Sequence, residues 1–422
     1  MFRLRPHSVP FTLLLAALVT LASFATDMGL PVLAATAASL GVTPATAALT
    51  MSVFMVGFAF GPLVIAPVSD RFGRRPILLI GCATFAAFGA LGAFAHSLGA
   101  LLAWRLLMGA GAGTAQVLVI ATVRDLFSGR EARTRQSYVN LAAGLAPVIA
   151  PTLGVWIASL GGWRAIYGAL AGGGTALFAL VAVGFAETAP MANRTALTVR
   201  GTIRNYGRVI RNPLTMGYSL VVALGFGYLF AYVSGSSLVL IGVMGVSQRN
   251  YGLLFAATSL GLIGGSFANA RLNRRGVSHT RLIAVGLATI VAVALLLLVL
   301  AATRLLTAWL LVPLVVVSFV GHAIVRANAV QGALEPMPEI AGVASALLTG
   351  LQMIVGALAS AVAATLFDGR SALAMTGTMA ICASAAISIY IALVRPAERR
   401  FRAGHVPIRS PELALYADVV AA

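Results

Sequence analysis

An aspartate lies inside the first long apolar stretch of the chain. Asp27 falls within the run from Phe11 to Ala37, and it is the only acidic residue in any apolar stretch long enough to span a bilayer. An ionised carboxylate at such a depth costs about 2.5 to 3.5 kcal/mol on insertion scales, and it usually marks an ion or substrate path. Asp27 therefore predicts a proton site, with a permanent structural ion pair as the alternative.

An arginine lies at a matching depth. Arg105 is about six residues from the end of the fourth apolar stretch, and Asp27 is about seven from the corresponding end of the first. At about 1.5 Å per helical residue, both lie roughly 10 Å inside the same membrane face. A buried arginine needs a carboxylate or a polar cavity, so we expect Asp27 and Arg105 to act together in proton coupling.

Coupling requires that Asp27 gain and lose a proton near neutral pH. Burial favours the neutral carboxyl, whereas a close Arg105 favours the charged form. We expect Asp27 to contact Arg105 or polar groups in one conformation and to be drier and protonated in the other, so that substrate entry and proton loading compete. A single buried acid predicts one proton per cycle.

The most specific local pattern is the basic turn at residues 66–76 (APVSDRFGRRP). Glycine allows a tight turn, and Pro76 suits the start of the next helix. An aspartate among arginines near helix ends can make and break contacts as the conformation changes, whereas a turn that only sets topology needs no aspartate. We predict a conformational latch made of Asp70, Arg71, Gly73, Arg74 and Arg75.

The composition indicates a polytopic membrane protein. Of the 422 residues, 60% are hydrophobic and 9% charged, and the mean hydropathy is +0.97, too apolar for a soluble surface. The net charge of +18 comes from 29 arginines and no lysine, mostly between apolar stretches, so no nucleic-acid partner is expected. No cluster of His, Cys and carboxylates has metal-ligand spacing, so we expect no metal or cofactor. Cys82 and Cys382 are expected to be free, buried thiols.

Windows of about 19 apolar residues predict an all-α membrane protein with twelve transmembrane helices. With the N-terminus in the cytoplasm, 23 of the 29 arginines fall on the cytoplasmic side. This bias predicts that both termini are cytoplasmic. A signal sequence cleaved near residues 23–25 is the alternative reading of the N-terminus. The predicted spans are 11–34, 45–67, 77–96, 99–122, 136–159, 164–186, 214–240, 251–271, 282–303, 305–328, 341–366 and 371–394.

The longest connection divides the spans into six and six. We predict an N-terminal bundle (1–186), a cytoplasmic linker (187–213), a C-terminal bundle (214–394) and a poorly ordered cytoplasmic tail (395–422). Arginines at 200, 204, 208 and 211 have helical spacing, which indicates a short helix on the anionic inner leaflet; a disordered linker is the alternative. Basic turns recur at 70–75 and 271–275, the layout of a transporter built from parallel repeats.

These motifs resemble the major facilitator superfamily, and within it the twelve-span drug:proton antiporters of the Bcr/CflA subfamily. The basic turn matches the superfamily's loop signature, with Ala66 where glycine is usual. Residues 26–31 (TDMGLP) resemble the span-1 motif, residues 105–109 (RLLMG) the span-4 motif, and residues 146–155 (APVIAPTLGV) the antiporter motif of span 5. The latter predicts motif roles for Pro147, Pro151 and Gly154. Further similar segments are 124–127 (RDLF), 162–166 (GWRAI), 232–236 (YVSGS), 333–336 (ALEP) and 341–352.

The resemblance implies two pseudo-symmetric six-helix bundles in a bacterial inner membrane, export, and a monomer. It also implies that spans 1 and 4 line a central cavity. Polar or flexible side chains inside the spans are candidate substrate contacts, although such side chains more often form contacts between helices. A mostly apolar cavity suits neutral or singly cationic lipophilic compounds. The candidates are Met28, Tyr138, Asn140, Tyr232, Asn328 and Gln352.

The sequence therefore favours a proton-coupled efflux pump for small amphipathic drugs such as phenicol-type antibiotics. The alternative on the same fold is an exporter of one endogenous metabolite or siderophore. An enzyme is not expected, because no nucleophile or metal set lies within the spans. A passive channel is not expected either, because unequal spans give no symmetric pore. His322 is expected to be a packed core histidine, with a second proton site as the alternative.

Overall fold

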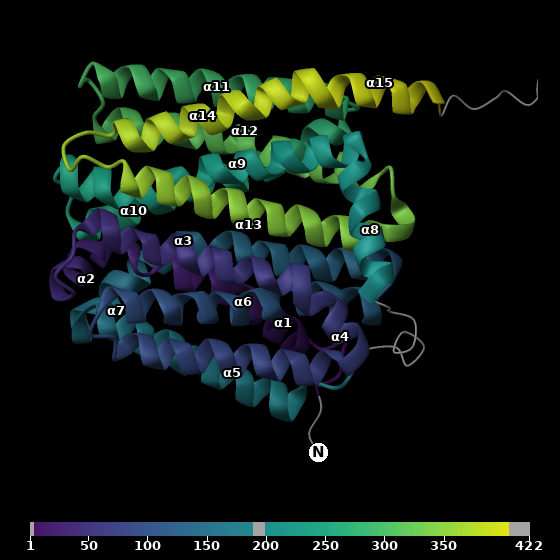
Figure 1. The fold of residues 1–422 in the computed structure, drawn as a ribbon, viewed down its shortest axis with the longest axis horizontal. Helices are drawn as coiled ribbons and strands as arrows, with labels where there is room; N and C mark the ends of the chain where they lie inside the picture. The colour runs from purple at the N-terminus through teal and green to yellow at the C-terminus, as the bar shows by residue number, and fades with distance from the viewer. Residues whose placement is uncertain (1–3, 189–198, 405–422) are drawn as a thin grey trace, which may run out of the picture.

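The computed structural model describes residues 4–188 and 199–404, and this part of the chain consists of helices joined by turns (Figure 1). Eleven of its helices are long and apolar enough to cross a membrane. The longest, α7 (Gly129–Gly184), leaves helical geometry at Gly161 and Gly162, where φ is −165° and +69°. Because this break divides α7 into two spans, the predicted twelve transmembrane helices are confirmed.

The first half of the chain folds into one bundle, the lower half of Figure 1. Several of its helices begin with a polar cap followed by proline: Ser8 accepts from Phe11 N, and Thr43 accepts from Thr46 N, which satisfies free N–H groups in the first turn. The elements before α7 are α1 (Val9–Asp27), η1 (Leu30–Val32), α2 (Leu33–Ser39), α3 (Pro44–Phe60), η2 (Gly61–Ile65), α4 (Ala66–Phe72), α5 (Arg74–Ala93) and α6 (Leu98–Leu126).

The second half forms the upper bundle of Figure 1. Each bundle packs around its own apolar core. Cys82 and Cys382 are free and buried, as predicted. The elements of the second bundle are α9 (Pro213–Ser237), η4 (Leu238–Val243), α10 (Gln248–Arg274), α11 (His279–Ala302), α12 (Ala308–Leu334), η5 (Pro338–Ile340), α13 (Ala341–Thr365), α14 (Leu373–Ile389), η6 (Tyr390–Val394) and α15 (Arg395–Gly404).

Two segments that the sequence left uncertain are helical. The linker contains α8 (Val199–Arg211), which crosses between the bundles at the end of the molecule where the described part of the chain begins and ends (Figure 1). We call this end the terminus end. Tyr206 of α8 donates to the Leu63 carbonyl at 3.2 Å, and Arg208 pairs with Glu339 at 3.0 Å. The prediction of a poorly ordered tail is wrong for its first part, because α15 continues the last span to Gly404; residues 405–422 lie outside the described ranges.

The bundles meet along α3 with α13 and along α7 with α10. Ser52 of α3 donates to Ser360 of α13 at 3.0 Å. A small apolar cluster, which includes Leu33, Ala48 and Leu238, joins the bundles at the end opposite the termini. The molecule is therefore closed at that end, which we call the far end.

Candidate functional site

Arg105 is positioned by the close packing of α6 on α3. Gly109 and Gly113 follow Arg105 at four-residue steps on the same face of α6, and a Cβ at either would lie within 2.2 Å of an α3 carbonyl oxygen. Only glycine allows backbones to approach so closely. This packing brings the Arg105 guanidinium against the backbone of α3.

The Arg105 guanidinium joins three helices. Its Nε donates to the Thr50 carbonyl on α3 at 3.2 Å, and its Nη1 donates to the Ala25 carbonyl on α1 at 2.8 Å. Its carbon lies 4.5 Å from the centre of the Phe54 ring. Only 4% of the surface of Arg105 is exposed. Backbone carbonyls and an aromatic ring therefore stabilise its charge in place of water.

Asp27 lies at the end of α1, 5% exposed. Asp27 and Arg105 are close enough to interact electrostatically, but among the described residues no ion pair within 4 Å joins them. Asp27 and Arg105 therefore lie in one region of the bundle, as their predicted equal depth in the membrane requires. The arginine is held by backbone carbonyls, and a joint role of Asp27 and Arg105 in proton coupling stays a prediction.

The proposed antiporter motif lies against the Asp27 turn. Pro147 and Pro151 are inside α7, and Gly154 packs on the residue after Asp27. A Cβ at Gly154 would lie 2.1 Å from the Met28 carbonyl oxygen. The motif therefore sets how closely α7 approaches the end of α1.

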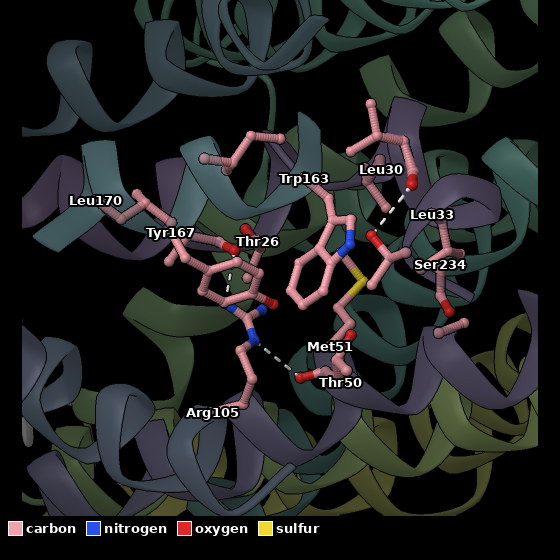
Figure 2. A pocket seen from close by; sticks show the side chains of 16 residues that line it. Thr26, Leu30, Leu33, Thr50, Met51, Arg105, Trp163, Tyr167, Leu170 and Ser234 are labelled. Atoms are coloured by element: carbon pink, nitrogen blue, oxygen red, sulfur yellow. Dashed lines mark hydrogen bonds between the residues drawn. The ribbon is translucent and has the colours of Figure 1, made fainter. Parts of the chain in front are cut away.

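A pocket lies beside Arg105 (Figure 2). Both bundles line it, because Ser234 of α9 completes a wall otherwise made by α1, α3, α6, α7 and the segment after α1. Asp27 is not part of this wall. The lining residues are Ala25, Thr26, Gly29, Leu30, Val32, Leu33, Thr36, Ala48, Thr50, Met51, Arg105, Trp163, Ile166, Tyr167, Leu170 and Ser234.

The six substrate candidates named from the sequence lie outside this wall. Tyr138 and Asn140 are exposed on α7, where Gln136 donates to Asn140 at 3.0 Å. Met28, Tyr232, Asn328 and Gln352 are buried; Tyr232 donates to Thr258, and Asn328 to Asn269. These contacts fit helix packing, and a substrate role stays a prediction. His322 is buried in α12.

The latch residues surround the turn between α4 and α5. Gly73 has φ +99°, a conformation that favours glycine. Arg74, 2% exposed, donates to Asp125 at 3.0 Å and to Ser69 at 2.6 Å. Arg75 donates to the Ala182 carbonyl at 2.7 Å, and Arg71 is exposed. The Asp70 side chain lies outside the described part of the structure.

Two acidic partners at this turn were missed by sequence reasoning. Glu187 accepts from the backbone N–H groups of Arg74 at 2.8 Å and Arg75 at 3.3 Å, so it caps the start of α5. Asp125 was noted only as part of the RDLF segment. The second bundle repeats the arrangement, since Glu398 accepts from Thr280 at 3.0 Å at the start of α11. Glu187 and Glu398 follow the last span of their bundles, and this matching position in the two repeats could have suggested the contacts of both glutamates.

We expect Asp125→Ala to destabilise the protein. It removes the carboxylate that accepts from the buried Arg74 Nε at 3.0 Å, and removing one partner of a buried pair costs about 3–5 kcal/mol. The unfolding temperature of the purified protein in detergent measures the loss. Glu339→Ala is the control, because the exposed pair of Glu339 with Arg208 contributes about 0–1 kcal/mol. Equal unfolding temperatures for the two variants would contradict the role of Asp125.

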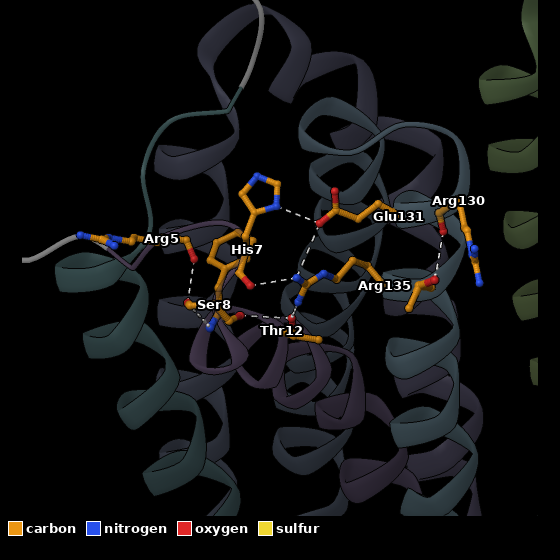
Figure 3. Close-up of polar contacts among 9 residues, drawn as sticks. Arg5, His7, Ser8, Thr12, Arg130, Glu131 and Arg135 are labelled. Atoms are coloured by element: carbon orange, nitrogen blue, oxygen red, sulfur yellow. Dashed lines mark hydrogen bonds and ion pairs between the residues drawn. The ribbon is translucent and has the colours of Figure 1, made fainter.

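A polar cluster at the terminus end ties the start of α1 to the start of α7 (Figure 3). His7 Nδ1 lies 2.8 Å from Glu131, and Arg135 donates to the His7 carbonyl at 2.9 Å and to the Thr12 hydroxyl. The first span is thus anchored at one end by this cluster and at the other by Arg105 and Gly154. This anchoring fixes where Asp27 lies.

Twelve membrane-spanning helices in two bundles, with a pocket lined by both and a buried charge at its wall, define a multi-pass membrane transporter. A family model described as Major Facilitator Superfamily matches residues 14–360. The chain belongs to the major facilitator superfamily, which confirms the resemblance found in the motifs. It is therefore a transporter and not an enzyme.

Relatives with curated descriptions are similar over most of their length. The chain is 32% identical to the bicyclomycin resistance protein homolog of Haemophilus influenzae over 90% of this chain and 95% of that protein. It is 28% identical to multidrug resistance protein D of Escherichia coli over 89% and 94%. It is 33% identical to the chloramphenicol resistance protein of Pseudomonas aeruginosa over 60% and 59%.

Solved structures confirm the fold. The human organic anion transporter MFSD10 (TETRAN) superposes with a TM-score of 0.67 at 20% identity, over 90% of this chain and 98% of that one. The D-xylose-proton symporter superposes with a TM-score of 0.67 at 15% identity, over 91% and 98%.

Proposed function

We propose that this protein exports small amphipathic drugs, such as phenicol-type antibiotics, in exchange for protons. The observation that carries the proposal is the pocket at the junction of the two bundles, with Arg105 in its wall and the buried acid Asp27 beside it. The names of the relatives, which include bicyclomycin, multidrug and chloramphenicol resistance, support a drug as the cargo.

The coupling step is an exchange of partners at Asp27. In the conformation described here the far end is closed and Arg105 donates to the Ala25 and Thr50 carbonyls. An unpaired buried carboxyl is most stable when neutral, so Asp27 holds its proton in this state. Drug entry from the terminus end displaces this proton toward the cytoplasm, as Asp27 becomes hydrated or moves to Arg105. When the far end opens, the drug leaves and Asp27 takes up a proton from the outside, so that drug and proton exchange places.

Alternating access requires the contacts between bundles to break in turn. At the far end these include Ser52 with Ser360 and the apolar cluster of Leu33, Ala48 and Leu238. At the terminus end, α8 bridges the bundles through Tyr206 and Arg208. The latch at Arg74 responds to the same motion through Asp125. Rocking of two bundles about a central site is the general mechanism of such repeats.

We propose that both termini lie on the cytoplasmic side of a bacterial inner membrane, and the distribution of the arginines along the chain supports this orientation. Arg204, Arg208 and Arg211 lie on α8 at the terminus end, where anionic lipid headgroups attract basic residues. We propose that the protein acts as a monomer, since one chain supplies both walls of the pocket.

Inverted membrane vesicles test the function. A drug gradient imposed across vesicles that contain the protein is expected to drive proton movement, and vesicles from cells without the protein are the control. Absence of drug-driven proton movement for every drug tested would refute proton-coupled drug export.

A resistance screen separates the proposal from export of one endogenous compound. Expression in cells that lack their own pumps is expected to give resistance to several unrelated amphipathic drugs, because a largely apolar pocket with few polar groups tolerates varied shapes. Resistance to none, together with secretion of one metabolite or siderophore, would favour the alternative.

A further inference from the structure

The pocket beside Arg105 carries hydrogen-bond donors that the described residues do not use. Trp163 is 5% exposed, and its indole Nε1 has no hydrogen-bond partner in the described part of the chain. Figure 2 shows this nitrogen turned toward the side of the pocket that holds Met51. A buried N–H without a partner is costly, so a partner from outside the chain is favoured.

Arg105 adds further unused donors. The guanidinium has five N–H groups, and the carbonyls of Ala25 and Thr50 accept from its Nη1 and Nε. The remaining N–H groups are not engaged by the residues that the structure describes. The donor-rich part of the pocket therefore lies between Arg105 and Trp163.

Three of the five hydroxyl groups of the wall, those of the threonines, offer acceptors only. Thr26, Thr36 and Thr50 each donate to a backbone carbonyl of their own segment, so their protons are already used. None of the sixteen lining residues is acidic. A cationic ligand would therefore meet the positive charge of Arg105 without a carboxylate in the wall to offset it.

The rest of the wall is apolar and aromatic. Trp163 and Tyr167 pack edge to face with ring centres 5.8 Å apart, and Leu30, Leu33 and Met51 line the opposite part. Such a wall favours a ligand that carries an apolar or aromatic ring at one end.

We propose that this pocket selects neutral amphipathic ligands with acceptor oxygens, such as amide or nitro oxygens, and discriminates against lipophilic cations. Trp163 Nε1 donates to one acceptor oxygen, and Arg105 donates to another. The inference rests on the proposed function, because it concerns the same site, and it narrows the ligand class to neutral acceptor-bearing compounds.

Direct binding to the full-length protein in nanodiscs tests the inference. The probes are chloramphenicol, a neutral aromatic nitro amide, and the tetraphenylphosphonium cation. Trp163→Phe keeps a ring but removes the donor, so the chloramphenicol Kd is expected to rise about five- to tenfold, the value of one hydrogen bond. Trp156→Phe is the matched control, because Trp156 lies in the other span of α7 and is 61% exposed; its loss is expected to leave the Kd unchanged.

Two results would overturn the inference. One is an unchanged chloramphenicol Kd in Trp163→Phe. The other needs no variant: tighter binding of tetraphenylphosphonium than of chloramphenicol by the native protein. Proton-coupled export of the cation alone would refute the ligand class but leave drug export standing. Vesicles that export neither probe nor any other drug would refute the proposed function itself.

Discussion

Substrate-driven proton movement is expected to fall to the level of empty vesicles in Asp27→Asn. Asparagine has nearly the same shape as a protonated aspartate but cannot release a proton, so the exchange at the end of α1 stops. Asp27 is the only acid in the predicted spans, and no second carboxyl is available there to replace it. Drug binding is expected to persist, because Asp27 does not line the pocket.

Asp368→Asn is the control for this variant. Asp368 lies in the turn between α13 and α14, and hydrogen bonds from the backbone of Arg370 and Ser371 hold the pKa of its carboxyl below the usual range. It therefore stays charged throughout the cycle and carries no proton. Normal coupling in Asp27→Asn, measured in the same vesicles, would contradict the proposed role of Asp27.

Arg105→Ala is expected to abolish transport and to weaken drug binding. The change removes the hydrogen bonds from the guanidinium to the Ala25 and Thr50 carbonyls, and a hydrogen bond that involves a charged group contributes about 1.5–3 kcal/mol. It also removes the positive charge from the pocket wall. The measurements are vesicle transport, chloramphenicol binding and the unfolding temperature.

Arg105→Lys separates the charge of Arg105 from its geometry. Lysine keeps the charge but lacks the planar fork that reaches two carbonyls on different helices. We expect partial binding and strongly reduced transport. Arg249→Ala is the control, since Arg249 is exposed in the first turn of α10, at the far end of the molecule. Transport at the native rate by Arg105→Ala would show that the charge is not needed.

Hydropathy and charge alone predicted the architecture. Long apolar stretches have few ways to satisfy their backbone in a membrane other than as helices, so the span count followed directly. The depths of Asp27 and Arg105 followed from the constant rise of a helix. The separation of Asp27 and Arg105 could not be predicted, because it depends on which backbone carbonyls accept from the guanidinium. Nothing in the sequence indicates that the carbonyls of Ala25 and Thr50 do so.

The pocket was the least predictable feature. Its lining depends on which faces of α1, α3, α6 and α7 turn together, and that is set by close glycine contacts such as Gly154 on Met28. Single polar residues such as Tyr138 and Tyr232 were chosen by type, and type does not distinguish a surface or a helix contact from a binding wall. Trp163 was visible only as part of a motif.

The protonation state of Asp27 in a locked conformation is the most direct test of the account. The hydroxyls of Ser52 and Ser360 are 3.0 Å apart, so a Ser52→Cys, Ser360→Cys disulfide is expected to hold the far end closed once Cys82 and Cys382 are replaced. Infrared spectra with and without Asp27→Asn isolate the carboxyl band of this residue. We predict a protonated Asp27 at neutral pH in the locked protein, and loss of the band when the disulfide is reduced and chloramphenicol is added. A charged Asp27 in both states would contradict the account.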